Sequence, residues 1–121
     1  MEEEGSGASD AVDLDEALEM VGGDMELLQE VVAVFLEEDY PRQLAALKEG
    51  LAGDDAKTVG DAAHGIKGAL ASFGGRTGYQ VALKLETMGR SGTLTGAREL
   101  ALRLESEVSR FAAFFAQVEA G

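Results

Sequence analysis

The apolar residues of this chain recur at steps of three and four, the spacing that places side chains on one face of an α-helix. A short helix is expected from Asp13 to Met20, and the turn Gly22–Asp24 follows it. Asp24 can cap the next helix, because its side chain can accept from unpaired amides of the first turn. That helix carries a first apolar stripe: Leu28, Val31, Val32, Phe35 and Leu36. Pro41 lacks an amide hydrogen and should kink the helix or divide it after Asp39–Tyr40.

The pattern resumes beyond Pro41 and leads into another helix. Three leucines continue the stripe: Leu44, Leu47 and Leu51. Gly53 and Asp54 then mark the end of the helix and a new cap. The next segment, Asp54–Phe73, places six apolar residues on one face: Val59, Ala62, Ala63, Ile66, Leu70 and Phe73.

Two more helices complete the pattern. The turn Phe73–Gly78 precedes one that ends at Gly89–Gly92, and its apolar residues are Val81, Ala82, Leu85 and Met88. The last helix has a heptad-like seam: Leu94, Ala97, Ala101, Leu104, Val108, Phe111, Phe115 and Val118. With no convincing strand alternation, we predict an all-α fold. It should be an antiparallel up-and-down four-helix bundle with a short additional N-terminal helix. A dimeric coiled coil would use the same seam, but the bundle needs it for its own core, so we expect a monomer.

Length and composition fit a single intracellular domain. The chain has 121 residues and no cysteine, which excludes disulfides and thiolate metal sites. No apolar run approaches the roughly 20 residues that span a bilayer, and the start lacks the basic and apolar regions of a secretory signal. We expect a cytoplasmic protein with a disordered acidic N-terminus at residues 1–9 and a folded domain at 10–121.

The net charge of −13 is unevenly distributed. Residues 1–41 contain 14 acidic and no basic residues, whereas residues 42–121 contain 9 acidic and 10 basic residues. A chain this acidic should bind neither nucleic acid nor an anionic membrane surface. The acidic third is most simply a solvated tail and helix face.

His64 is the only histidine, and a helical wheel places it away from the apolar face of its segment. Gly60, Gly68 and Ala71 fall near it on the wheel, and Lys67 lies one turn away. We therefore expect an exposed imidazole on a surface of small residues that a partner protein can approach. Neutral imidazole is a competent nucleophile, and Lys67 could balance the charge of a phosphoryl group.

Glycine inside a helix needs a reason. Gly60, Gly65 and Gly68 each cost this helix roughly 1 kcal/mol relative to alanine. Close approach of another surface is one reason, and close helix packing is the other. A surface histidine one turn from a lysine is also ordinary, so the pattern by itself leaves both interpretations open.

Several motifs together resemble the histidine-containing phosphotransfer (HPt) domain. They are AHGIKGALASFGG at Ala63–Gly75, LE at Leu85–Glu86 and MGRSG at Met88–Gly92. The upstream segment Val21–Leu47 is also similar to the family's leading segment. The resemblance extends from about Asp13 to Val118. It implies an antiparallel four-helix bundle with the phosphorylated histidine exposed at mid-helix.

By this resemblance His64 is the phosphoryl acceptor, Lys67 steadies the phosphoryl group and Gly68 admits the receiver domain. The sequence also departs from the family. Ala69 stands where a serine is common, and Glu86 stands where some members carry glutamine. Glu86 could orient a ring nitrogen of the histidine but would repel phosphate. Arg90, one turn beyond Glu86, could neutralise that carboxylate or meet the phosphoryl group, and a plain surface pair is the alternative.

The implied function is a relay of phosphoryl groups between aspartates of response-regulator receiver domains, supplied by an upstream hybrid histidine kinase. No cofactor, metal or ATP-dependent kinase activity of its own is expected, since no Gly-rich nucleotide motif is present. One alternative is the phosphate-accepting domain of a chemotaxis-type or hybrid histidine kinase. Another is a receiver-binding module that accepts no phosphate. A di-iron protein using Asp61 and His64 would need a second histidine.

Overall fold

The computed structural model describes residues 11–120, with side chains as far as Val118. The described part of the chain is helical, and in place of strands it has a single isolated bridge between Val12 and Gly75. The predicted all-α class is confirmed. The predicted disorder of residues 1–9 lies outside the described residues. No helix between residues 11 and 120 has the length and apolar character needed to cross a membrane.

The first described helix, α2 (Leu14–Glu19), is short and leads into α3 (Met25–Val34) through a glycine turn. Gly22 and Gly23 adopt φ angles of 65° and 83°, a region that favours glycine. As the pattern predicts, Asp24 caps α3, and its side chain accepts from the amide of Leu27 at 3.0 Å.

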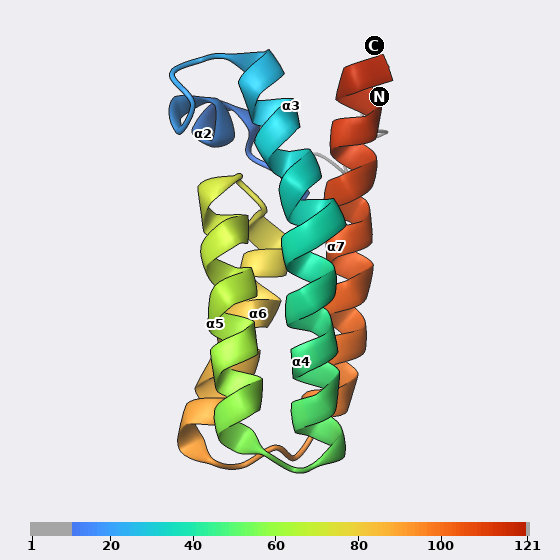
Figure 1. The fold of residues 1–121 in the computed structure, drawn as a ribbon. Coiled ribbons are helices and arrows are strands. Elements are labelled where there is room, and N and C mark those ends of the chain that lie inside the picture. The colour runs from blue at the N-terminus through green and yellow to red at the C-terminus, as the bar shows by residue number, and fades with distance from the viewer. Residues whose placement is uncertain (1–10, 121) are drawn as a thin grey trace, which may run out of the picture.

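Pro41 does not divide the long helical segment that begins at Met25. The chain continues from α3 through the π-helical turn η1 (Phe35–Asp39) into α4 (Tyr40–Ala52). In this wider turn the amide of Tyr40 donates to the carbonyl of Phe35, five residues earlier. Figure 1 shows α3 inclined to α4 across the turn, so of the two predicted effects the structure has the bend.

The connections of α5 (Ala56–Ser72) differ slightly from the sequence expectation. Its cap is Asp55, which accepts from the amide of Thr58 at 3.2 Å, and not Asp54. Asp54 instead turns the chain with a φ of 53°. The turn after α5 is shorter than predicted, because α6 (Arg76–Ser91) begins directly after Gly75.

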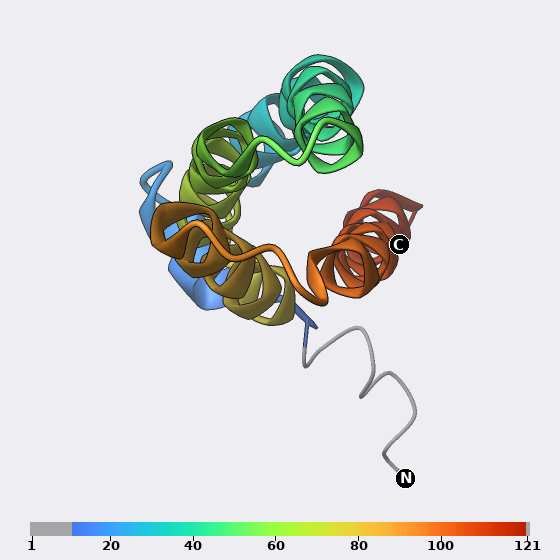
Figure 2. The same cartoon turned by 90° about the horizontal axis from the view of Figure 1, so that it is seen from below.

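The last helix, α7 (Ala97–Ala120), contributes its predicted seam to the core. Six seam residues are buried: Ala97, Ala101, Leu104, Val108, Phe111 and Phe115. Leu94 precedes the helix. Figures 1 and 2 show α5 and α6 side by side, with α4 beside α5 and α7 beside α6. The two central helices, α5 and α6, carry the residues singled out from the sequence.

Candidate functional site

His64 lies near the middle of α5, and its side chain is 62% exposed. Its neighbours Ala62 and Ala63 are buried in the core. The same helix therefore turns an apolar face inward and its imidazole outward, as the wheel predicts. The helix backbone therefore fixes the position of His64 in the fold, while its ring is open to a reaction partner.

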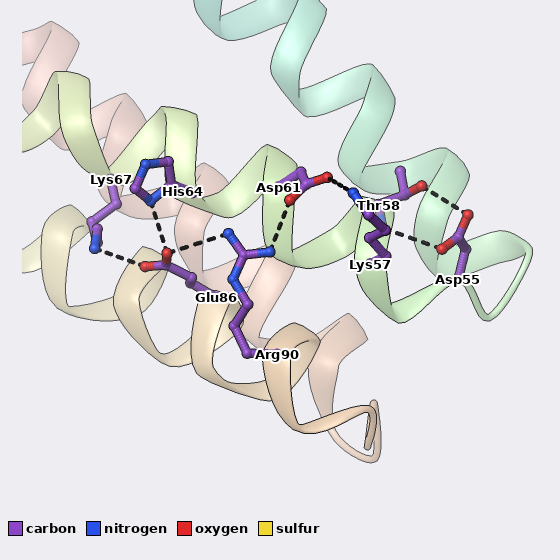
Figure 3. Close-up of polar contacts among 8 residues, drawn as sticks. All are labelled: Asp55, Lys57, Thr58, Asp61, His64, Lys67, Glu86 and Arg90. Atoms are coloured by element: carbon purple, nitrogen blue, oxygen red, sulfur yellow. Dashed lines mark hydrogen bonds and ion pairs between the residues drawn. The ribbon is translucent and has the colours of Figure 1, made fainter.

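Glu86 of α6 links His64 to Lys67 (Figure 3). Its Oε2 lies 2.8 Å from Nδ1 of His64, and its Oε1 lies 2.7 Å from Nζ of Lys67. The Glu86 side chain is only 13% exposed, and that of Lys67 is 21% exposed. The predicted proximity of Glu86 and His64 is thus present, and the carboxylate forms an ion pair with the lysine as well.

The charge of Glu86 determines which nitrogen of the imidazole carries the proton. The Lys67 ammonium, and to a lesser extent His64, lowers the pKa of Glu86 below its usual range, against the opposing effect of desolvation. Glu86 is therefore ionised at neutral pH and can only accept hydrogen bonds. Nδ1 of His64 must then donate, and in the neutral ring Nε2 holds the free electron pair. Figure 3 shows this second nitrogen directed away from Glu86.

A second charged cluster borders the first one along α5 and α6. Nη1 of Arg90 lies 2.8 Å from Oδ1 of Asp61, and Nζ of Lys57 lies 2.9 Å from Oδ2. These hydrogen bonds from Arg90 and Lys57 lower the pKa of Asp61 to about 2. Asp61 in turn raises the pKa of Arg90. Nη2 of Arg90 is also 3.7 Å from Oε2 of Glu86, so Arg90 connects the two clusters.

Asp61 and Lys57 do not belong to the predicted phosphotransfer site. The sequence pattern suggests a role for Asp61 only as a metal ligand, and it does not single out Lys57. Their spacing of four residues is a signal for an ion pair, and Asp61 stands three residues before His64 on the same helix. Among the described residues, no group of three or more His, Asp or Glu could hold a metal. Asp61 is engaged by two cations instead.

The small residues predicted to surround His64 separate into different environments. Gly68 and Ala71 are exposed, and a Cβ at Gly68 would meet nothing within 4 Å. Gly60 is buried, which contradicts its predicted place on the docking surface. A Cβ on Gly60 would lie 3.1 Å from Nη1 of Arg90 and 3.4 Å from Cα of Gly89, because α6 crosses α5 there at close range. Gly60 therefore leaves room for the backbone of α6 and for the guanidinium of Arg90.

Comparison with known families agrees with this arrangement. The Hpt domain family model matches residues 30–114, a range that contains His64, Lys67 and Glu86. No curated protein and no solved structure matched the chain. The family carries out histidine phosphotransfer in two-component phosphorelays, and its members interact with response regulators and kinases of those systems. Since the match covers well over half of its length, this chain belongs to the Hpt domain family.

Proposed function

We propose that this chain relays a phosphoryl group between aspartates of receiver domains through a phosphohistidine at His64. The arrangement of His64 and Glu86 carries the proposal. An ionised carboxylate accepts from Nδ1 at 2.8 Å, so Nε2 of an exposed ring is left with its electron pair. The acceptor atom is therefore Nε2.

The transfer requires little from this chain beyond placement and charge. The Nε2 electron pair of His64 forms a bond to phosphorus, the bond from phosphorus to the receiver's aspartyl oxygen breaks, and the aspartate leaves as a carboxylate. The ring keeps its Nδ1 hydrogen and becomes cationic, and the carboxylate of Glu86 stabilises that charge. The reverse sequence passes the phosphoryl group to a second aspartate. Lys67 is the cation that balances the phosphoryl charge.

The surface around His64 suits a protein partner. Gly68 and Ala71 are exposed on the helix that carries the histidine, so a receiver domain can approach without meeting side chains there. We propose receiver domains and an upstream hybrid histidine kinase as partners of a cytoplasmic monomer. We also propose that residues 10–121 form the folded domain. The short turns between consecutive long helices support an up-and-down antiparallel four-helix arrangement of the bundle.

The assignment is tested with His64→Gln. A receiver domain charged with radiolabelled phosphate should label the wild-type protein and leave His64→Gln unlabelled. The label should survive alkali and be lost in acid, as expected of a nitrogen–phosphorus bond. Labelling of the Gln variant at the wild-type level would refute the proposal, whereas tight receiver binding without labelling of either protein would favour a binding module.

A further inference from the structure

Lys67, the cation assigned to the phosphoryl group, is already bound to a carboxylate. Its Nζ lies 2.7 Å from Oε1 of Glu86, and its side chain is largely covered. The phosphoryl group would be on Nε2 of His64, the nitrogen that points away from Glu86 (Figure 3). Lys67 must therefore leave Glu86, at least in part, before it can neutralise a phosphoryl group.

Arg90 occupies a position from which it can replace Lys67. It lies one turn beyond Glu86 on α6, with Nη2 at 3.7 Å from Oε2 of Glu86. That distance is slightly too long for a hydrogen bond. Asp61 holds the guanidinium at this position through a 2.8 Å contact to Nη1. A small shift of Arg90 along α6 would bring it onto Glu86.

We propose that phosphorylation of His64 exchanges the cation at Glu86: Lys67 turns to the phosphoryl group and Arg90 closes onto the carboxylate. This inference rests on the proposed function. Arg90 acts through Glu86 and does not touch the phosphoryl group, so it is a positioning residue. The phosphohistidine then has one dedicated cation, and Glu86 has another.

The charges of the site favour the exchange. Three cations (Lys57, Lys67 and Arg90) and two carboxylates (Asp61 and Glu86) leave one net positive charge before the reaction. A phosphoryl group adds up to about two negative charges. If Lys67 moved alone, the largely buried Glu86 would keep only the imidazole and the long 3.7 Å contact with Arg90 to balance its charge. With Arg90 closed onto it, the carboxylate stays paired, because a carboxylate oxygen can accept two hydrogen bonds.

Asp61 does not obstruct the exchange. Its second oxygen accepts from Nζ of Lys57 at 2.9 Å, so it keeps a cation when Arg90 shifts. Oε2 of Glu86 likewise keeps its contact with Nδ1 of His64, and the imidazole stays in place. The movement is confined to the ends of two long side chains.

A double-mutant comparison tests the exchange. The protein is phosphorylated with phosphoramidate, and the loss of phosphohistidine is followed by phosphorus NMR. Arg90→Met should shorten the phosphohistidine half-life severalfold, approaching the effect of Lys67→Ala, because Lys67 stays bound to Glu86. In a Glu86→Gln background, Arg90→Met should change the half-life by less than about twofold, because no carboxylate retains Lys67. Arg90→Lys should restore most of the half-life.

Three further results keep the test decisive. An equal shortening by Arg90→Met in both backgrounds would mean that Arg90 contacts the phosphoryl group or supports the fold, and would overturn the exchange. Asp61→Asn releases Arg90 toward Glu86 without removing it, so the half-life should stay the same or lengthen. A shortening there would also overturn it, even if Arg90→Met failed to fold. Absence of phosphohistidine in the wild type would instead refute the proposed function.

Discussion

Among residues 11–118, the imidazole of His64 has one hydrogen-bond partner, Glu86, and this hydrogen bond makes the two ring nitrogens chemically different. Glu86 accepts from Nδ1 and leaves Nε2 free. A glutamine at this position could also present a carbonyl oxygen to Nδ1, but its amide could equally donate to an unprotonated Nδ1. A carboxylate removes that ambiguity, since it only accepts. A glutamate in place of glutamine at position 86 therefore fixes which ring nitrogen of His64 carries the hydrogen.

Glu86→Gln tests this assignment without any phosphotransfer. In wild-type protein at pH 8, nitrogen–proton NMR of the imidazole should show mainly the form with hydrogen on Nδ1. In Glu86→Gln the two neutral forms should both be populated, because the amide can satisfy either one. Glu16→Gln, at an exposed position of α2, is the control for the same chemical change elsewhere and should leave the imidazole signals unchanged. An unchanged spectrum in Glu86→Gln would show that another group fixes the ring.

At the scale of the helix, the three glycines of α5 face three different surroundings. Gly60 faces Gly89 of α6, and Gly65 faces the side chain of Gln43 on α4. Gly68 faces open space. The destabilisation that glycine brings to a helix is offset by packing at the first position, whereas at Gly68 no packing offsets it. Gly68 is therefore the position at which a functional explanation is most needed.

Gly68→Gln should separate stability from function. The side chain has room, and replacing glycine inside a helix favours folding, so the melting temperature should be no lower than that of wild type. The same side chain should obstruct the receiver, because transfer geometry tolerates little displacement. Phosphoryl acceptance from a receiver should slow at least about tenfold, a loss of about 1.4 kcal/mol in the barrier.

Gly89→Ala is the structural counterpart. The Cβ of an alanine at this position would collide with the backbone of Gly60, so this variant should melt at a lower temperature, although Gly89 is not one of the residues predicted for receiver docking. If Gly68→Gln melts early as well, Gly68 also serves packing. If it is stable and accepts phosphate normally, the receiver approaches from another side.

Local sequence patterns predict these helices well but not how they meet. The cap at Asp24 follows from one aspartate before an apolar stripe, whereas Asp54 and Asp55 are adjacent and either could cap α5. The structure selects Asp55 because Asp54 takes a positive φ in the turn. Gly60 falls beside His64 on a wheel, but a wheel contains no information about the helix that covers it. The contact with Gly89 joins residues 29 positions apart, beyond the reach of any periodicity.

At the scale of the whole molecule, negative charge dominates. The chain has 23 acidic and 10 basic residues, and the 14 acidic residues before Arg42 have no basic residue among them. Repulsion among these groups opposes folding at neutral pH and is weakened by salt. Protonation toward the isoelectric point of about 4.3 should relieve it. The charged residues around His64 behave differently, because the carboxylates of Asp61 and Glu86 are paired with cations.

These two contributions predict a stability maximum in mildly acidic solution. From pH 7 to about 5, at low ionic strength, the melting temperature should rise as repulsion decreases. Below about pH 4, the ordinary pKa of an aspartate in an unfolded chain, the sign reverses. The folded pKa of Asp61 is lower, at about 2, so its stabilisation is complete above pH 4 and is lost as the pH falls through 2. Glu86, whose pKa is also lowered, contributes with the same sign.

Thermal unfolding followed by circular dichroism from pH 2 to pH 8 would measure both the rise in melting temperature from pH 7 to pH 5 and its fall below pH 4. Asp61→Asn has no carboxyl to protonate at this position, so it should lose less stability than wild type between pH 4 and pH 2, while keeping the rise from pH 7 to pH 5. Added salt at pH 7 should raise the melting temperature of both proteins. A melting temperature that falls steadily from pH 7 would show that the paired carboxylates outweigh the general repulsion. If Asp61→Asn and the wild type lose the same stability between pH 4 and pH 2, the contacts of Asp61 with Arg90 and Lys57 contribute nothing to folding.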